Sequence, residues 1–193
     1  MQKNIIIAGV GGQGILTIAS IIDLAAMNLG LNVKQAEVHG MSQRGGAVES
    51  HLRISTEEIY SDLIPLGKAD LILSIEPMES LRYLPFLSPE GVIVTSTEPY
   101  ENIDNYPDEK ELLNKIKESA STLLIAAKSI AREAGSAKTY NVAVLGAASP
   151  FLGIDSEELE KAIGVFFARK GETIVTTNLK AFRLGKDNAS KIR

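Results

Sequence analysis

Hydrophobic and polar positions follow one another along the chain in short blocks that predict strands and helices in turn. Residues 4–9 form an apolar, β-branched run that is typical of a buried strand. Residues 15–29 carry apolar side chains at helical spacing and are followed by Gly30, a common helix stop. Residues 32–38 read as a second strand. The beginning of the chain therefore predicts a βαβ unit.

The next block has a different period. In residues 47–54 apolar and polar side chains alternate, which predicts a strand with one solvated or partner-facing side, either antiparallel or at a sheet edge. Ile59 and Tyr60 are candidates to pair with this strand as a short hairpin. Residues 70–75 are largely apolar and predict a central strand that ends at Glu76.

The remaining blocks predict a short helix, two further strands and several helices, over residues 77–84, 91–95, 109–118, 122–126, 127–134, 141–152, 155–169 and 172–184. Alternation of strands with helices predicts a three-layer α/β/α, Rossmann-like domain with a mostly parallel, mixed sheet and a helical C-terminal region. We expect one domain over residues 1–185, followed by a polar tail over residues 186–193.

Composition narrows the class of protein. The net charge of −4 argues against a general nucleic-acid binder, which needs clustered basic surface. The chain has no cysteine, which excludes disulfides, zinc–thiolate sites and iron–sulfur clusters held by its own thiolates. The longest apolar stretch, residues 15–27, is interrupted by Thr17, Ser20 and Asp23, so we expect no membrane span and no signal peptide. These features predict a cytoplasmic protein.

A glycine-rich turn follows the first strand and precedes the first helix. Residues 9–14 read Gly-Val-Gly-Gly-Gln-Gly, which fits the pattern G-x-G-x-x-G. Glycines let backbone N–H groups approach an anion, and the helix N-terminus adds partial positive charge. Glu37 lies at the position where dinucleotide-binding enzymes carry an acidic residue that hydrogen-bonds the ribose. The turn is thus a candidate binding element, although tight strand–helix packing would need the same glycines; the candidate residues are Gly11, Gly12, Gln13 and Gly14.

Two further candidates lie at the predicted carboxyl edge of the sheet, where open α/β sheets bind ligands. The loop over residues 39–46 contains Arg44, which could pair with a carboxylate or pyrophosphate in bidentate fashion, and His39, which could donate a hydrogen bond. Glu76 ends the central strand at the same edge. A plain surface loop and a structural carboxylate are the competing interpretations, and for His51, in mid-strand, the structural one is favoured.

A complete catalytic set is missing from the sequence. It contains no G-x-S-x-G, no G-x-x-x-x-G-K-[ST] and no histidine–carboxylate cluster. A nucleophile accompanied by a base and an orienting group is not apparent. The chain is therefore not expected to catalyse a reaction by itself.

The combination of these motifs resembles the gamma-type domain of 2-oxoacid:ferredoxin oxidoreductases. The likeness covers essentially the whole chain, and the residues that carry it are 11–14 with Thr17, the loop 39–46, Asp70, Glu76-Pro77 with Glu79 and Leu81-Arg82, Asn141 with 145–147, and 180–182 with Gly185. The part of the loop before Arg44 is most similar to the indolepyruvate branch of that family.

The resemblance implies a division of labour between two chains. In such enzymes thiamine diphosphate performs the decarboxylation, iron–sulfur clusters pass electrons to ferredoxin, and CoA takes up the acyl group. The large subunit of the indolepyruvate type holds the thiamine diphosphate, its Mg²⁺ and the clusters. This chain would then be the small subunit, inactive alone and without a cofactor of its own. It would act on an aryl pyruvate, with indolepyruvate first. The glycine turn, Arg44 and Glu76 would contact CoA, the mouth of the active site or the partner.

Two alternatives remain open at this point. The glycine pattern with Glu37 would also suit an independent NAD(P)-dependent oxidoreductase. A non-catalytic nucleotide-binding or assembly module would need the same fold without turnover.

Overall fold

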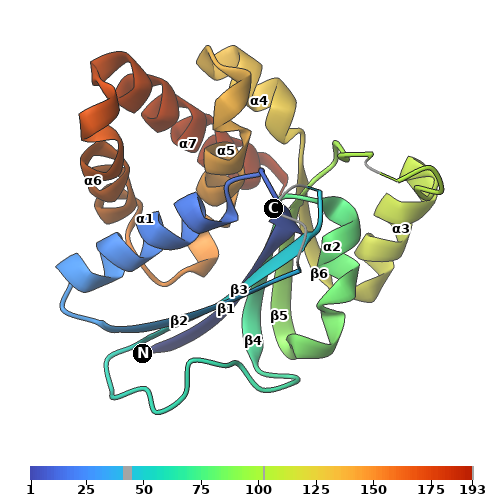
Figure 1. Cartoon of the computed structure of the whole chain (residues 1–193), viewed down its shortest axis with the longest axis horizontal. Coiled ribbons are helices and arrows are strands. Elements are labelled where there is room, and N and C mark those ends of the chain that lie inside the picture. Colours follow the sequence, from blue (N-terminus) through green and yellow to red (C-terminus); the bar gives the residue numbers. More distant parts are fainter. Residues whose placement is uncertain (41–44, 102, 193) are drawn as a thin grey trace.

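A six-stranded sheet lies between two layers of helices (Figure 1). The computed structural model describes residues 1–40, 45–101 and 103–192. Its strands are β1 (Gln2–Val10), β2 (Asn32–His39), β3 (Ala47–Ser55), β4 (Ala69–Ser74), β5 (Leu87–Ser96) and β6 (Ser121–Ile125). Its α-helices are α1 (Ile15–Asn28), α2 (Pro77–Arg82), α3 (Glu109–Ser119), α4 (Ala127–Ala134), α5 (Tyr140–Ala148), α6 (Ser156–Phe167) and α7 (Glu172–Ile192). The predicted α/β class is confirmed.

The strand order is β2-β3-β1-β4-β5-β6. β1, β4, β5 and β6 are parallel, and β3 is antiparallel to both of its neighbours, β1 and β2. The mixed sheet and the antiparallel strand were therefore predicted correctly. The predicted βαβ unit is present in split form: β1 and β2 are both antiparallel to β3 and hence parallel to each other, and α1 carries the chain across the position that β3 later fills.

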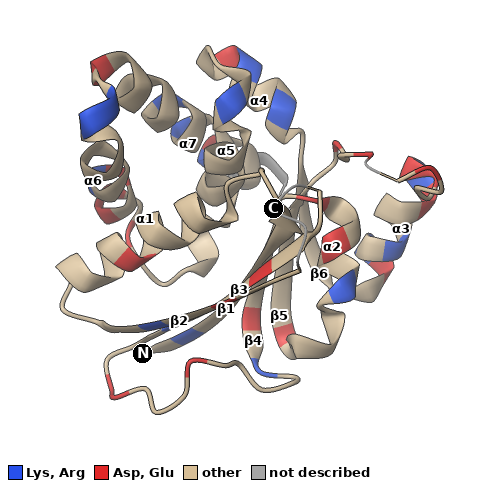
Figure 2. Ribbon diagram, in the orientation of Figure 1, with Lys and Arg blue, Asp and Glu red and all other residues tan. Residues whose placement is uncertain are grey.

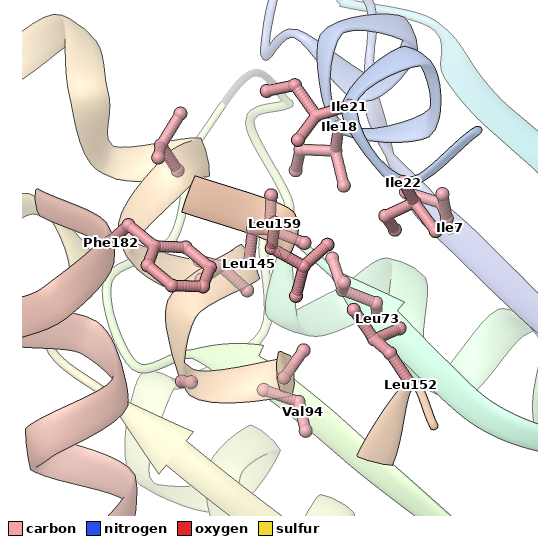
Figure 3. Close-up of a cluster of buried hydrophobic side chains, with 14 of the residues drawn as sticks. Ile7, Ile18, Ile21, Ile22, Leu73, Val94, Leu145, Leu152, Leu159 and Phe182 are labelled. Atoms are coloured by element: carbon pink, nitrogen blue, oxygen red, sulfur yellow. The ribbon is translucent and has the colours of Figure 1, made fainter. Parts of the chain in front are cut away.

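Both faces of the sheet are covered, and β1 is buried between them. Ile5 and Ile7 of β1 face α1, α5 and α7, whereas Ile6 and Ala8 face the side of α2 and α3. This explains why the sequence of β1 is a continuous apolar run without alternation. The larger core joins β1 and β4 to helices from both ends of the chain (Figure 3), with Ile18 and Ile22 of α1 meeting Leu145, Leu152, Leu159 and Phe182.

Two expectations about local structure were wrong. Ile59 and Tyr60 do not pair with β3, because the Arg53 guanidinium donates to the carbonyl of Ser61 (2.8 Å) and holds this segment as a loop. Residues 186–192 do not form a tail. They continue α7, and Ala189 is buried against the core at helical spacing from Phe182.

α5 and α7 cross at two glycines. A Cβ atom on Gly146 would overlap the carbonyl oxygen of Phe182, and one on Gly185 would overlap the carbonyl oxygen of Ala143. The two backbones are therefore in direct contact, so neither position accepts a side chain. This gives a physical reason for two glycines that belong to the family pattern.

Asp23 is the only charged residue of α1. Its Oδ1 atom is buried and has no hydrogen-bond partner among the described residues. Burial raises the pKa of Asp23 from 3.8 to about 6, because the ionised carboxylate loses hydration without gaining a donor.

We predict that Gly146→Ala or Gly185→Ala lowers the free energy of unfolding by about 2–3 kcal/mol, since the added methyl group forces two helices apart. Gly164→Ala in α6 is the matched control. Its Cβ would meet nothing within 4 Å, so this helical glycine should gain about 0.5–1 kcal/mol. Urea denaturation of the three variants measures the difference, and equal effects at Gly146 and Gly164 would contradict the crossing.

A second prediction concerns pH. The folded chain binds a proton at Asp23 more tightly than the unfolded chain does, so stability falls as pH rises from about 4 to about 6. Asp23→Asn should leave the free energy of unfolding nearly unchanged at pH 4 and raise it by about 1–2 kcal/mol at pH 8, after a discount for partial exposure. Urea denaturation between pH 4 and 8 tests this, with Asp62→Asn on an exposed loop as control. A pH-independent difference would count against it.

Candidate functional site

The glycine turn between β1 and α1 has a backbone that requires glycine. Gly12 and Gly14 have φ of +99° and +80°, in the left-handed region. A Cβ on Gly14 would also overlap the side-chain amide of Asn141, which donates to the Gly14 carbonyl (3.4 Å). A Cβ on Gly12, in contrast, would have no atom of the described residues within 4 Å. Gly14 therefore serves packing as well as the turn, whereas Gly12 borders open space.

Gln13 closes the turn from inside. Its side chain is buried, and its Oε1 accepts a hydrogen bond from the Val10 N–H (3.0 Å). The Gln13 N–H in turn donates to the Val10 carbonyl (3.1 Å). These bonds leave Gln13 directed into the protein, where it supports the turn.

The second motif ends beside the first. The Gly11 N–H donates to the Gly46 carbonyl (2.8 Å), and the Gly45 N–H donates to the Gly11 carbonyl (3.2 Å). These two bonds prolong the β1–β3 pairing past the ends of both strands. Arg44 lies outside the described residues.

A pocket of about 400 Å³ opens beside the turn. It lies between the beginning of α1 and the ends of β2 and β3. Apolar side chains and glycine backbone form most of it, and Glu37 and His39 are its polar side chains; the full lining is Val10, Gly11, Gly12, Gly14, Ile15, Leu16, Glu37, His39 and Val48. The sequence correctly placed Glu37 near the glycine turn, and three of the four candidate turn residues line the pocket.

Glu76 lies elsewhere. Its side chain is 1% exposed and does not line the pocket. One carboxylate oxygen accepts from the Tyr100 N–H (2.8 Å), and the other accepts from the Tyr106 hydroxyl and the Met78 N–H. Burial raises the pKa of Glu76, and the bonds from the two tyrosines oppose that rise. Glu76 thus caps α2 and ties down the segment after β5.

A second polar cluster lies where α2 meets β3. Glu79 is buried and accepts two hydrogen bonds from Arg82 (2.7 and 3.2 Å). His51 accepts from the Ile64 N–H through Nδ1 (3.1 Å), and its Nε2 lies 3.6 Å from Glu49. The structural interpretation of His51 agrees with these contacts. Local sequence patterns did not predict this cluster, although the alternation of residues 47–54 puts Glu49 and His51 on one side of the strand.

The arrangement is suited to binding. Among the described residues, no group of three histidine or carboxylate side chains could hold a metal ion. The pocket contributes backbone amides, apolar side chains, one carboxylate and one imidazole. Within the described parts of the chain, no helix combines the length and apolar composition that a membrane span requires.

Comparison with known proteins adds a family match. Residues 4–188 match the family described as pyruvate ferredoxin/flavodoxin oxidoreductase. The chain is 37% identical to indolepyruvate oxidoreductase subunit IorB of Thermococcus kodakarensis, with 99% of this chain and 98% of the relative covered. It is 39% identical to subunit IorB of Archaeoglobus fulgidus, with 98% and 96% covered.

Solved structures agree with the sequence relatives. The 2-oxoglutarate:ferredoxin oxidoreductase of Magnetococcus marinus, solved with 2-oxoglutarate, coenzyme A and succinyl-CoA bound, superposes with a TM-score of 0.80 at 26% identity. The match covers 100% of this chain and 32% of the chain from Magnetococcus marinus. The keto/oxoacid ferredoxin oxidoreductase gamma subunit of Geobacter sulfurreducens gives a TM-score of 0.72 at 25% identity, with 98% and 99% covered.

Proposed function

Because the chain belongs to the pyruvate ferredoxin/flavodoxin oxidoreductase family, we propose that it is the small subunit of an indolepyruvate-type 2-oxoacid:ferredoxin oxidoreductase. The observation that carries this proposal is the identity of 37–39% to IorB subunits over nearly the full length of both chains. The relatives named above are subunits of 2-oxoacid oxidoreductases, which favours this function over an independent NAD(P)-dependent enzyme and over a non-catalytic assembly module.

The chemistry is divided between the subunits. A large partner subunit supplies thiamine diphosphate with Mg²⁺ for decarboxylation and iron–sulfur clusters for electron transfer to ferredoxin. This assignment is supported by the composition of the small chain, which contains no cysteine to ligate a cluster. The substrate we propose is an aryl pyruvate, indolepyruvate first, and the product is the corresponding acyl-CoA.

The small subunit contributes part of the CoA site. We assign CoA to the pocket beside the glycine turn, with its pyrophosphate at Gly12 and the N-terminus of α1, since the Gly11 N–H is already bonded to the Gly46 carbonyl. Unpaired amides and the helix dipole at such a terminus favour an anion. The relative from Magnetococcus marinus was solved with coenzyme A bound, which supports CoA as the ligand class. Gln13 keeps the turn in shape, and Glu76 orders the segment after β5 from outside the pocket.

Reconstitution tests the function. The chain and its cognate large subunit, mixed at equal concentration, should reduce ferredoxin in the presence of indolepyruvate and CoA, and neither subunit should do so alone. Ferredoxin reduction is followed by its absorbance, and NAD⁺ or NADP⁺ replaces ferredoxin in a parallel assay. Turnover by the isolated chain, or no complex with the large subunit, would refute the proposal.

Gly12→Ala tests the CoA site. The new methyl group would project into the open space by the pocket, so we expect the KM for CoA in the reconstituted enzyme to rise by about tenfold, equivalent to roughly 1.4 kcal/mol. Gly171→Ala is the matched control, because Gly171 has φ of +95°, also borders open space and is far from the pocket in sequence. Both variants place a methyl group at a similar positive φ, so an equal KM for CoA in the two would argue against the site.

A further inference from the structure

The outer side of α1 is unusually apolar for a helix on the surface. Residues on that side follow one another at helical spacing, and we call them the α1 stripe: Leu16, Ser20, Asp23, Leu24 and Met27. Leu16 is 48% exposed and Met27 is 65% exposed. Figure 2 shows α1 with a single charged position, whereas α3 carries lysines and glutamates along its exposed side. A helix that is apolar all round is typically buried on all sides.

Asp23 lies in the middle of this stripe. Among the described residues, its buried Oδ1 has no donor, and burial is the cause of its raised pKa, with no cation offsetting its charge. A carboxylate that has lost hydration without a partner is costly, and a cation brought by another molecule would remove that cost. The stripe therefore lacks both an apolar cover and a positive charge.

The stripe is continuous with the pocket. Leu16, at its first position, also lines the pocket beside the glycine turn. A molecule that covers the stripe would reach the mouth of the pocket at the same time.

We propose that the α1 stripe is the surface on which the large subunit docks, with apolar side chains against Met27 and Leu24 and an arginine or lysine paired with Asp23. This inference rests on the proposed function. It adds which face of the small subunit the partner covers and which charge the partner brings.

A second copy of this chain fits the stripe less well. In a symmetric dimer the same patch meets itself, so the two Asp23 carboxylates would be brought to one interface. The stripe contains no lysine or arginine to pair with them. A longer partner is also consistent with the relative from Magnetococcus marinus, in which this fold makes up 32% of one chain.

Met27→Glu tests the docking surface. Binding of each variant to the large subunit is titrated by calorimetry, and thermal melting of the isolated variants verifies the fold. Leu66→Glu is the matched control, because Leu66 is 66% exposed on the loop between β3 and β4. We expect Met27→Glu to weaken binding by at least about tenfold, since it adds a second carboxylate to a desolvated contact, and Leu66→Glu to leave binding unchanged. Equal affinities for the two variants would overturn the proposal.

Asp23→Asn gives a second, independent readout. It should stabilise the isolated chain at pH 8 and yet weaken binding to the large subunit by about tenfold, because the partner's cation loses its carboxylate. A merely structural role for Asp23 predicts unchanged affinity, which would overturn the charge pairing.

Titration of the wild-type chain distinguishes a failure of the docking surface from a failure of the proposed function. Tight binding and turnover with wild type, together with unaffected Met27→Glu, refute the stripe alone. No binding of wild type refutes the proposed function as well. Light scattering of the isolated chain reports self-association, and a dimer broken by Met27→Glu with unchanged affinity for the large subunit would assign the stripe to a second copy.

Discussion

The antiparallel pairing of β3 with β1 is the constraint on which the site depends. Its register runs from Gln2 opposite Ser55 to Val10 opposite Ala47, and the bonds between Gly11 and Gly45–Gly46 prolong it beyond both strands. Gly11 is therefore held at the end of a ladder, and the chain has to reverse before Ile15 in order to begin α1. The left-handed conformations of Gly12 and Gly14 make that short reversal possible.

The same pairing decides where the pocket opens. In open α/β sheets, ligands commonly bind where consecutive crossovers diverge, here between β1 and β4. In this chain β4 is followed by Glu76, whose carboxylate is occupied by bonds to Tyr100, Tyr106 and Met78. The pocket lies instead on the other side of the glycine turn. There Val48 of β3, and Glu37 and His39 of β2, line it together with the first turn of α1.

The sequence predicted which residues form strands and helices better than it predicted which of these elements lie side by side. Each strand and helix has its own spacing of apolar residues along the sequence, so the α/β class and most of the elements could be predicted from that spacing alone. The position of β3 between β1 and β2 could not, because the alternation of residues 47–54 indicates a half-polar strand but carries no information about which strands it pairs with. Tertiary contacts likewise explain the misjudged tail, since Ala189 is one buried position among polar ones.

The candidate site was predictable to a similar degree. The glycine turn follows β1 and Glu37 lies near the carboxyl end of β2. The two share a pocket because both strands end at the same edge of the sheet. Glu76 shares that edge, yet its bonding partners come from a segment 24 and 30 residues further along the chain, beyond the reach of a local motif. The distinction between Gly12 and Gly14 needed Asn141, which is 127 residues from Gly14.

α1 connects the pocket beside the glycine turn with the α1 stripe. Its first turn borders the pocket, its inner side packs on β1 and α6, and its outer side is the apolar stripe around Asp23. Because a helix moves as a rigid unit, a partner pressed against the outer side would displace or hold the first turn together with the rest of α1. The proposed CoA site and the proposed contact with the large subunit would therefore be coupled through one element. In the proposed complex, docking of the large subunit would in this way set the geometry of the proposed CoA site.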